Sequence, residues 1–256
     1  MVFSYFTYFY IMENKLGLVF GIRAIIEAIN ANQTLEKIYL QKGLSGSLFS
    51  ELNSLIKKHS ISTSHVPVEK LNHLSKNQNH QGVIAKISAI YFYDLETFLE
   101  ENQNKKTLFL LLDQITDVRN FGAILRTAEC TGVNAIVIPS QGSAPLNADA
   151  IKTSAGAAFK IPICKVNHLL DAIYLLQSEG IQIAAITEKT DNSIYQVDFN
   201  KPTAIVMGSE HKGISPSILK IADTKAKLPL LGDIESLNVS VACGVALYEV
   251  VRQRFQ

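Results

Sequence analysis

The sequence predicts an α/β protein with two units, a small α/β domain followed by a larger domain that contains a parallel sheet. Strand-like runs alternate with helical segments along most of the 256 residues, a length that suits one large domain or two small ones. After residue 106 the strand-like runs are apolar throughout, which is typical of parallel strands covered by helices on both faces. We favour two domains, because a polar stretch at 100–106 separates the two kinds of pattern.

The first unit, residues 12–90, is expected to be a small α/β domain. Its predicted segments are a strand at 18–20, a helix at 22–30, a strand at 36–40, a helix at 47–59, an extended segment at 64–68, a helix at 68–75 and a strand at 83–90. The loop KNQNHQG at 76–82 precedes the last strand. Residues 91–106 are expected to be a short helix and a polar linker.

The first eleven residues are apolar, but they are too few to span a bilayer, and they lack the basic start and cleavage site of a signal peptide. We interpret residues 1–11 as an upstream extension and Met12 as the start. A membrane-surface anchor is the alternative, although one short apolar segment contributes little to stable attachment. No membrane partner is expected.

The second unit, residues 107–256, begins with the apolar strand TLFLLLD. The elements expected after it are a helix at 121–130, a strand at 135–138, a helix, a strand, a helix at 168–178, and strands at 181–186 and 203–208. A loop with Ser236, Leu237 and Asn238 then leads into a final helix that is apolar almost all round as far as Arg252. Such a helix is expected to be buried in a core or against a second subunit.

The composition describes a folded globular protein, with 47% hydrophobic and 18% charged residues and a formal net charge of +1. A charge so close to zero gives no broad basic footprint for nucleic acid, so any RNA must be held by local patches. The three cysteines are widely spaced in apolar surroundings, which disfavours disulfides and a metal site. A reducing cytoplasm fits this pattern best.

Polar residues and glycines gather at three places, each at the C-terminal end of a predicted strand, where open α/β sheets bind ligands. Asn120 precedes a predicted helix, and Arg126 lies within that otherwise small and apolar helix, where an arginine usually has an anionic partner. Gly208 and Glu210 follow a buried strand, and Asn238 ends the last loop. The alternatives are that Asn120 only caps a helix and that the glycine pattern is only a turn.

The sequence lacks the usual fingerprints of dinucleotide binding, of P-loop nucleotide binding, of zinc proteases and of serine hydrolases. Spacing alone therefore predicts a small-molecule site beside an arginine and a glutamate, and it does not name the reaction.

Three ordered stretches do resemble a known family. NFGAILRTAE (120–129), IVMGSEHKGIS (205–215) and LPLLGDIESLNVSVACGVALYEVVRQR (228–254) are similar to the three motifs of the SpoU (TrmH-like) RNA ribose 2′-O-methyltransferases of the SPOUT superfamily. The stretches VFGIRAIIEAI, EKIYL and NHQGVIAKI resemble the ribosomal-protein-like substrate-binding domain of a subset of that family. That subset includes the enzyme that forms 2′-O-methylguanosine in large-subunit ribosomal RNA.

The resemblance implies a trefoil knot around residues 228–238 that holds S-adenosylmethionine, although true knots are nearly absent from proteins otherwise. It implies a set of cofactor-binding positions, namely Met207, Gly208, Leu228, Leu230, Ser236 and Leu237. Arg126 is the family's candidate for activating the ribose hydroxyl, with Asn120, Glu210 and Asn238 around it. Because a guanidinium is a poor base, we expect Arg126 to clamp a phosphate and stabilise alkoxide charge.

Asn79, His80 and Gln81 are expected to contact RNA, since a polar loop of this kind suits splayed bases and 2′-hydroxyls. A tight turn is the alternative. Ribosomal RNA is the favoured substrate and transfer RNA the second, and the final helix is expected to form a homodimer. A catalytically silent RNA-binding factor is a rival function. A nucleotide-cofactor oxidoreductase is disfavoured by the missing glycine fingerprint.

Overall fold

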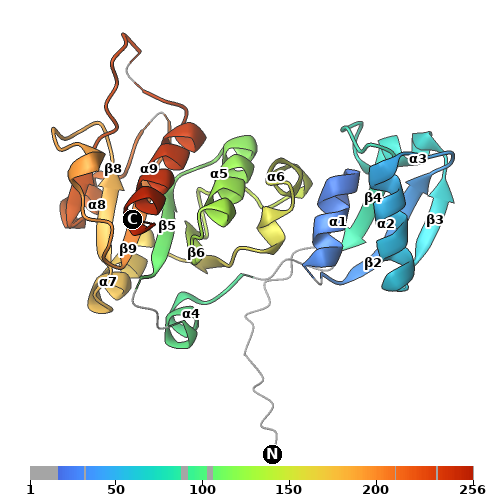
Figure 1. Cartoon of the computed structure of the whole chain (residues 1–256), viewed down its shortest axis with the longest axis horizontal. Helices are drawn as coiled ribbons and strands as arrows, with labels where there is room; N and C mark the ends of the chain where they lie inside the picture. Colours follow the sequence, from blue (N-terminus) through green and yellow to red (C-terminus); the bar gives the residue numbers. More distant parts are fainter. Residues whose placement is uncertain are drawn as a thin grey trace, which may run out of the picture.

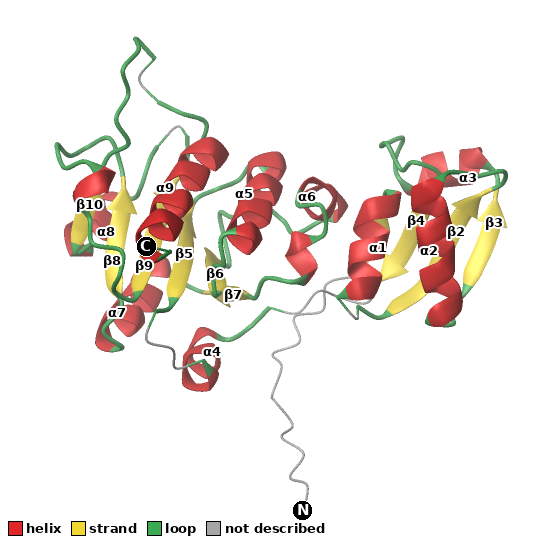
Figure 2. Ribbon diagram, in the orientation of Figure 1, coloured by secondary structure: helices red, strands yellow, loops and turns green. Residues whose placement is uncertain are grey.

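The computed structural model describes residues 17–31, 33–87, 92–102, 106–210, 212–234 and 236–255. These residues form two sheets with their own helices, shown side by side in Figure 1 and by element type in Figure 2. The two-part α/β architecture predicted from the sequence is confirmed. The upstream extension expected at residues 1–11 lies outside the described residues.

The first sheet has four strands in the order β1-β4-β2-β3. The strands are β1 (Gly17–Phe20), β2 (Leu35–Gln41), β3 (Thr63–Val66) and β4 (Val83–Ile87), and the helices are α1 (Ile22–Asn30), α2 (Ser47–Lys58) and α3 (Val68–Leu74). β4 pairs antiparallel with β1 and β2, whereas β2 and β3 are parallel. Alternate residues of β4 pack in different clusters, Ala85 with α1 and α2 and Ile84 with Leu71 of α3.

The segment expected as linker contains α4 (Leu95–Glu101), which packs on the second sheet. Its N-cap Asp94 accepts a hydrogen bond from the backbone of Thr97 at 3.0 Å. Phe98 is buried edge-to-face against Phe109 of the next strand, with the ring centroids 6.1 Å apart. The core of the second domain therefore includes residues that precede its first strand.

The second sheet has six strands in the order β10-β8-β9-β5-β6-β7, and all its pairings are parallel. The strands are β5 (Leu108–Asp113), β6 (Ala135–Pro139), β7 (Ile163–Val166), β8 (Gln182–Ile186), β9 (Thr203–Gly208) and β10 (Thr224–Ala226). Leu110 packs in the cluster on one face of the sheet and Phe109 in the cluster on the other. Burial on both faces explains why these strands carry no polar alternation.

Helices cover both faces of this sheet. One face carries α5 (Val118–Cys130), α6 (Ala148–Thr153), the 3-10 turns η1 (Ala157–Phe159) and η2 (Ile194–Gln196), and α9 (Val239–Arg254). The other face carries α4, α7 (Leu169–Ser178) and α8 (Pro216–Ile221). No helix in the described ranges is long and apolar enough to cross a membrane.

The final helix α9 is covered on one side only within the single chain. Cys243, Ala246, Leu247 and Val250 are buried, whereas Val241 and Tyr248 are 52% and 57% exposed. The sequence predicts that this helix is buried either in a core or against a second subunit, and one face of it is indeed buried in the core of the single chain. The other face remains open.

A buried carboxylate in α9 was not expected from its apolar pattern. Glu249 accepts two hydrogen bonds of 2.8 Å from the guanidinium of Arg252, one to each carboxylate oxygen, and a third from Gln253. The hydrogen bond with Arg252 keeps the pKa of Glu249 below its usual value, although partial burial opposes the shift. This pairing lets a charged residue lie on the covered side of the helix.

Candidate functional site

Three side chains from distant parts of the chain meet at the carboxyl edge of the second sheet. The Asn120 Nδ2 donates to Glu210 Oε1 at 3.0 Å, and Asn238 Nδ2 donates to the same oxygen at 2.6 Å and to Asn120 Oδ1 at 3.0 Å. Asn120 lies in the first turn of α5, Glu210 follows β9, and Asn238 begins α9. All three were predicted as site residues, and the structure brings them together.

Local capping explains why the amides of Asn120 and Asn238 point toward Glu210. Asp117, not Asn120, caps α5, because its carboxylate accepts the backbone N–H of Asn120 at 2.7 Å. The side chain of Asn120 is therefore free for Glu210. Asn238 caps α9 through its Oδ1, which accepts the backbone N–H of Ser240 at 3.0 Å, and this leaves its Nδ2 to donate.

The Glu210 carboxylate lies beside the N-terminus of α9. Its Oε1 also accepts the backbone N–H of Val239 at 3.3 Å, so one oxygen receives three N–H groups. The positive end of the helix dipole stabilises a negative charge there. The other oxygen, Oε2, has no hydrogen bond to any described residue, and Glu210 is exposed to solvent.

Arg126 lies on α5, less than two turns beyond Asn120, and its side chain is exposed. The sequence predicts an anionic partner for it, yet within the described ranges it makes no hydrogen bond and no ion pair. Arg119 precedes it by seven residues, which puts both guanidinium groups on one face of the helix. Arg119 is also exposed and was not among the predicted site residues.

A cavity of about 370 Å³ lies next to Glu210. Its lining includes every predicted cofactor position, Met207, Gly208, Leu228, Leu230, Ser236 and Leu237. The backbone loop after β9 forms one wall, and the start of α9 forms another through Val239 and Ala242. The predicted cofactor residues are thus grouped in space around one hollow.

Gly208 has a clear steric reason to be glycine. A Cβ at this position would lie 2.2 Å from the carbonyl carbon of Gly213 and 2.3 Å from the nitrogen of Ile214. The loop closes on itself there, since Gly213 N–H donates to the Ser209 carbonyl at 2.8 Å. The pattern of Gly208, Glu210 and Gly213 is therefore a turn, and that turn is also a cavity wall.

Sequence reasoning missed a further wall of the same cavity. Thr187, Glu188 and Lys189 follow β8, and Lys227 follows β10; all four line the cavity. The stretch TEKT stands directly after a buried strand, as the predicted site segments do. Its position at the carboxyl edge could have marked it as part of the site.

The loop expected to contact RNA is largely bonded inside the protein. His80 is 7% exposed; its Nδ1 accepts the N–H of Gly82 at 2.9 Å and its Nε2 lies 2.9 Å from Asn72 Oδ1. Nδ1 as acceptor requires the proton on Nε2, which donates to Asn72. Burial and, secondly, the nearby charge of Lys152 lower the pKa of His80. His80 therefore stabilises the loop from inside, and its predicted contact with RNA stays a prediction.

The other two residues of this loop have backbone partners. Gln81 Oε1 accepts the backbone N–H of Ile22 at the start of α1 at 3.1 Å. Asn79 Oδ1 accepts the N–H of Gln81 at 3.3 Å, and the Asn79 carbonyl accepts from Lys152 of the second domain. Both side chains are exposed, so their predicted contact with RNA stays a prediction.

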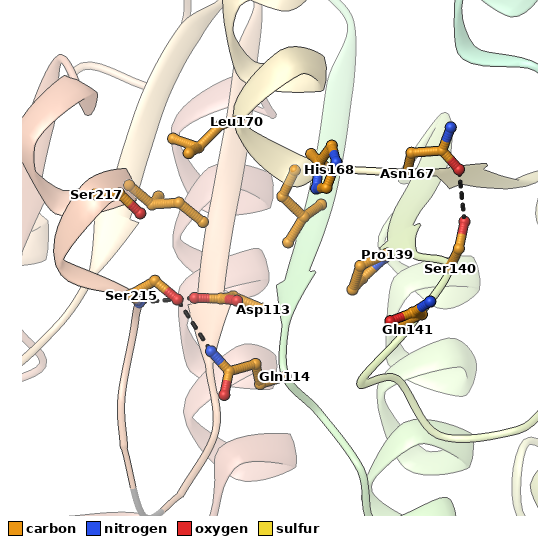
Figure 3. A pocket seen from close by; sticks show the side chains of 12 residues that line it. Asp113, Gln114, Pro139, Ser140, Gln141, Asn167, His168, Leu170, Ser215 and Ser217 are labelled. Atoms are coloured by element: carbon orange, nitrogen blue, oxygen red, sulfur yellow. Dashed lines mark hydrogen bonds between the residues drawn. The ribbon is translucent and has the colours of Figure 1, made fainter.

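A second polar pocket, of about 450 Å³, lies at the tips of β5, β6 and β7 and at the start of α8 (Figure 3). Ser215 N–H donates to the buried carboxylate of Asp113 at 2.7 Å, and Gln114 Nε2 donates to Ser215 Oγ at 3.0 Å. Ser140 Oγ lies 3.3 Å from Asn167 Oδ1 on the opposite side. None of the predicted site residues lines this pocket.

The buried cysteines and the acidic groups form no further reactive centre. Burial raises the pKa of both Cys164 and Cys243 to about 12, so neither thiol ionises near neutral pH. In the part of the chain that the structure describes, no three His, Cys, Asp or Glu side chains are grouped so that they could hold a metal ion.

Comparison with known proteins agrees with this arrangement. The profile of the SpoU rRNA Methylase family matches residues 107–248, and the profile for RNA 2′-O ribose methyltransferase substrate binding matches residues 18–93. The putative TrmH family tRNA/rRNA methyltransferase YacO of Bacillus subtilis is 33% identical over 95% of this chain and 98% of its own length. The 23S rRNA (guanosine-2′-O-)-methyltransferase RlmB of Xanthomonas campestris pv. campestris is 35% identical, over 95% and 99%.

The fold is also found in a solved structure. The SpoU methyltransferase AviRb from Streptomyces viridochromogenes, in complex with the cofactor AdoMet, superposes with a TM-score of 0.79 at 23% identity, covering 93% of this chain and 90% of that one. One family profile covers more than half of the chain, and relatives above 30% identity cover nearly all of it. The chain therefore belongs to the SpoU rRNA methylase family of RNA 2′-O-ribose methyltransferases, with that family's substrate-binding domain at its N-terminal end.

Proposed function

We propose that this protein transfers a methyl group from S-adenosylmethionine to the ribose 2′-hydroxyl of a guanosine in 23S ribosomal RNA. The observation that carries the proposal is the hydrogen-bonded group of Asn120, Glu210 and Asn238 next to a cavity lined by the family's third motif. A relative at 35% identity over nearly the full length is named for that reaction, which supports the choice of substrate.

The cavity beside Glu210 suits the proposed cofactor. Leu228, Leu237 and Met207 offer apolar surface for an adenine ring, and the turn after Gly208 offers backbone groups for its polar edge. The turn comes close because Gly208 has no side chain. We propose that these residues, with Leu230 and Ser236, hold the cofactor, chiefly through main-chain groups and apolar packing.

When bound, the cofactor would supply an electrophilic methyl group for the ribose oxygen, which must lose its proton as the new C–O bond forms. We propose that Asn120, Glu210 and Asn238 form a fixed surface that positions the ribose, since their mutual hydrogen bonds hold all three side chains in place. The exposed Oε2 of Glu210 is a free acceptor for a hydroxyl.

Arg126 is proposed to bind the phosphate next to the target ribose and to stabilise the charge that develops on its oxygen. Its guanidinium has no partner within the described ranges, so it is available to an external anion. A guanidinium gives up its proton too reluctantly to act as a base. The ribose proton would leave to the phosphate or to water.

We also propose that the open face of α9 forms a homodimer. Val241, Val245 and Tyr248 are exposed and share that face, where a second copy of the chain would cover them. The site residues Asn238 and Glu210 lie at the start of the same helix. The proposed setting is the cytoplasm, because buried cysteines without disulfide partners suit reducing conditions.

Transfer RNA is the second candidate substrate, because the relative YacO is named a putative tRNA/rRNA methyltransferase. Incubation with labelled S-adenosylmethionine and unmodified 23S or transfer RNA, followed by mass spectrometry of the methylated nucleosides, tests both. A label on 23S guanosine ribose supports the proposal, and a label only on transfer RNA supports the alternative. Cofactor binding without transfer to either RNA would favour a silent RNA-binding factor.

A further inference from the structure

The two domains touch through apolar packing of α6 and η1 on β1 and α1, and through a few polar and charged contacts around it. Figure 1 shows α1 of the first domain beside α6, and α1 also contacts the turn η1 that follows α6. The loop 76–82 of the first domain lies against α6 as well. These contacts do not involve Asn120, Glu210 or Asn238, but they include Asn79, which is predicted to contact RNA.

The first contact is an ion pair in a tightly packed region. Lys160 Nζ lies 2.8 Å from Glu27 Oε2, and the Glu27 side chain is only 19% exposed. A Cβ on Gly156, which has a φ of +87°, would lie 2.2 Å from Glu27 Cβ and 2.7 Å from its Cγ. The hydrogen bond to Glu27 raises the pKa of Lys160, which shows that the pair favours the charged ammonium.

The second contact joins the loop 76–82 to α6. Gln78 Nε2 donates to Asp149 Oδ2 at 2.6 Å, and Lys152 Nζ donates to the carbonyl of Asn79. The conformation of the loop is fixed by hydrogen bonds, because His80 is bonded at both ring nitrogens and Gln81 is bonded to the start of α1. The loop is thus joined to α6, and α1 is joined to the turn η1 that follows α6.

The helix α6 is in turn pressed against the helix that carries Asn120 and Arg126. A Cβ on Gly122 of α5 would lie 2.6 Å from Thr153 Cβ and 2.7 Å from the carbonyl oxygen of Ala150, both in α6. Packed interiors of this kind transmit displacement instead of absorbing it. A continuous set of contacts therefore runs from Glu27 through η1, which follows α6, and through α6 itself to α5.

We infer that Glu27, Lys160 and the loop 76–82 are positioning residues, which hold the first domain at a fixed place on α6 so that RNA bound there meets α5 in one orientation. The inference rests on the proposed function, and it gives the Asn79–Gly82 stretch a second task as a domain clamp. Displacement of reacting groups by about 1 Å can cost 10²-fold in rate, so a fixed domain junction matters for catalysis.

The test compares two glycine substitutions. Gly156→Ala pushes a methyl group into Glu27, whereas the control Gly180→Ala places one where no heavy atom lies within 4 Å, at a similar φ of +75°. Both variants place an alanine at a positive φ, so both carry backbone strain of this kind. For Gly156→Ala we expect about a 10- to 100-fold loss in kcat/KM with ribosomal RNA, a larger maximum dimension by small-angle scattering, and unchanged affinity for S-adenosylmethionine.

A second set of variants reverses the charges of the ion pair, and it tests the inference even if Gly156→Ala fails to fold. Lys160→Glu should behave like Gly156→Ala, and the double variant Glu27→Lys, Lys160→Glu should recover most of the wild-type kcat/KM and the wild-type scattering profile. The inference is overturned if Gly156→Ala matches Gly180→Ala in both readouts, or if the double variant recovers nothing. If the wild-type protein transfers no methyl group, the proposed function fails, and the scattering comparison still decides whether the junction is fixed.

Discussion

Asn238 donates a hydrogen bond of 2.6 Å to Glu210, across 28 positions of sequence and from the capping residue of α9. One amide thus holds the start of the last helix with its oxygen and the turn after β9 with its nitrogen. The relationship ties the cavity wall to the helix that carries the proposed dimer face. Replacing this one side chain should separate the two roles.

Asn238→Asp keeps an oxygen that can cap α9 but replaces the donor with a second carboxylate next to Glu210. We expect a loss of about 1 to 3 kcal/mol in the free energy of unfolding at pH 7, from the lost hydrogen bond and the like charge, together with loss of methyl transfer. Asn147→Asp is the matched control, because Asn147 caps α6 in the same way without donating to a carboxylate. Chemical denaturation of both variants measures the difference; equal stabilities would contradict the role given to Asn238.

Gly208→Ala should weaken cofactor binding without unfolding the domain. Its Cβ would meet the backbone of Gly213 and Ile214 and force the turn after β9 to move, at a cost of about 1 to 3 kcal/mol. We expect affinity for S-adenosylmethionine to fall by at least about tenfold in isothermal titration. Gly232→Ala lies in the loop before α9 with no heavy atom within 4 Å of its Cβ and should bind normally. Equal affinities in the two variants would contradict the proposal that this cavity binds the cofactor.

Arg126→Lys keeps the positive charge but loses the two-pronged contact with a phosphate. We expect kcat/KM to fall by about 10- to 100-fold, while stability stays within about 0.5 kcal/mol because the side chain is exposed and has no partner among the described residues. Steady-state kinetics with 23S RNA and thermal unfolding provide the two values. Near-normal turnover would rule out the clamp.

His80 should make the first domain less stable in mild acid. Its pKa in the folded protein lies below the ordinary 6.5, because burial and the charge of Lys152 oppose protonation. The unfolded chain therefore takes up a proton first, and the stability that neutral His80 contributes is present above pH 6.5 and is lost as the pH falls toward the folded pKa. Unfolding of wild type and His80→Gln between pH 7.5 and about 5 should show a steeper loss for the wild type.

The same substitution at exposed His59, whose side chain has no hydrogen bond to a described residue, controls for removing an imidazole. Parallel pH profiles for the wild type and His80→Gln would disprove the internal role given to His80.

Val245→Glu should give a monomer if α9 forms the dimer. The side chain is 39% exposed on the open face of the helix, so the single chain should tolerate a glutamate there. In a symmetric dimer, however, the two copies of this glutamate would bury two like charges in the interface. Sedimentation equilibrium reports the mass, with Tyr174→Glu on exposed α7 as the control. A wild-type protein that sediments as a monomer would refute the proposed homodimer.

The sequence predicted those parts of the fold whose pattern follows from local burial. The strand 108–113 is apolar at every position but its last, because Phe109 and Leu110 enter different cores, and this is visible without a structure. The grouping of Asn120, Glu210 and Asn238 followed from their places at strand ends, since parallel strands bring their carboxyl ends to one edge. The trefoil knot remains an implication of family membership.

Other features depend on contacts with residues that the local sequence pattern does not indicate. His80 is hydrogen-bonded to Asn72 in the preceding helix, and its pKa is lowered by burial and, secondly, by the charge of Lys152 in the other domain. Glu249 was overlooked in an apolar helix, although Arg252 three residues later is the usual spacing of a helical ion pair. The cap of α5 was assigned to Asn120 as an alternative, whereas Asp117 three residues earlier was equally suitable in residue type.

The measurement that tests the central claim most directly is the mapping of methyl groups on RNA. Purified protein is incubated with labelled S-adenosylmethionine and unmodified 23S RNA, beside Arg126→Lys and Gly208→Ala as internal controls. The account predicts label on the ribose 2′-oxygen of a guanosine, and less label with either variant. Label on a base, or cofactor binding with no label on any RNA, would contradict it.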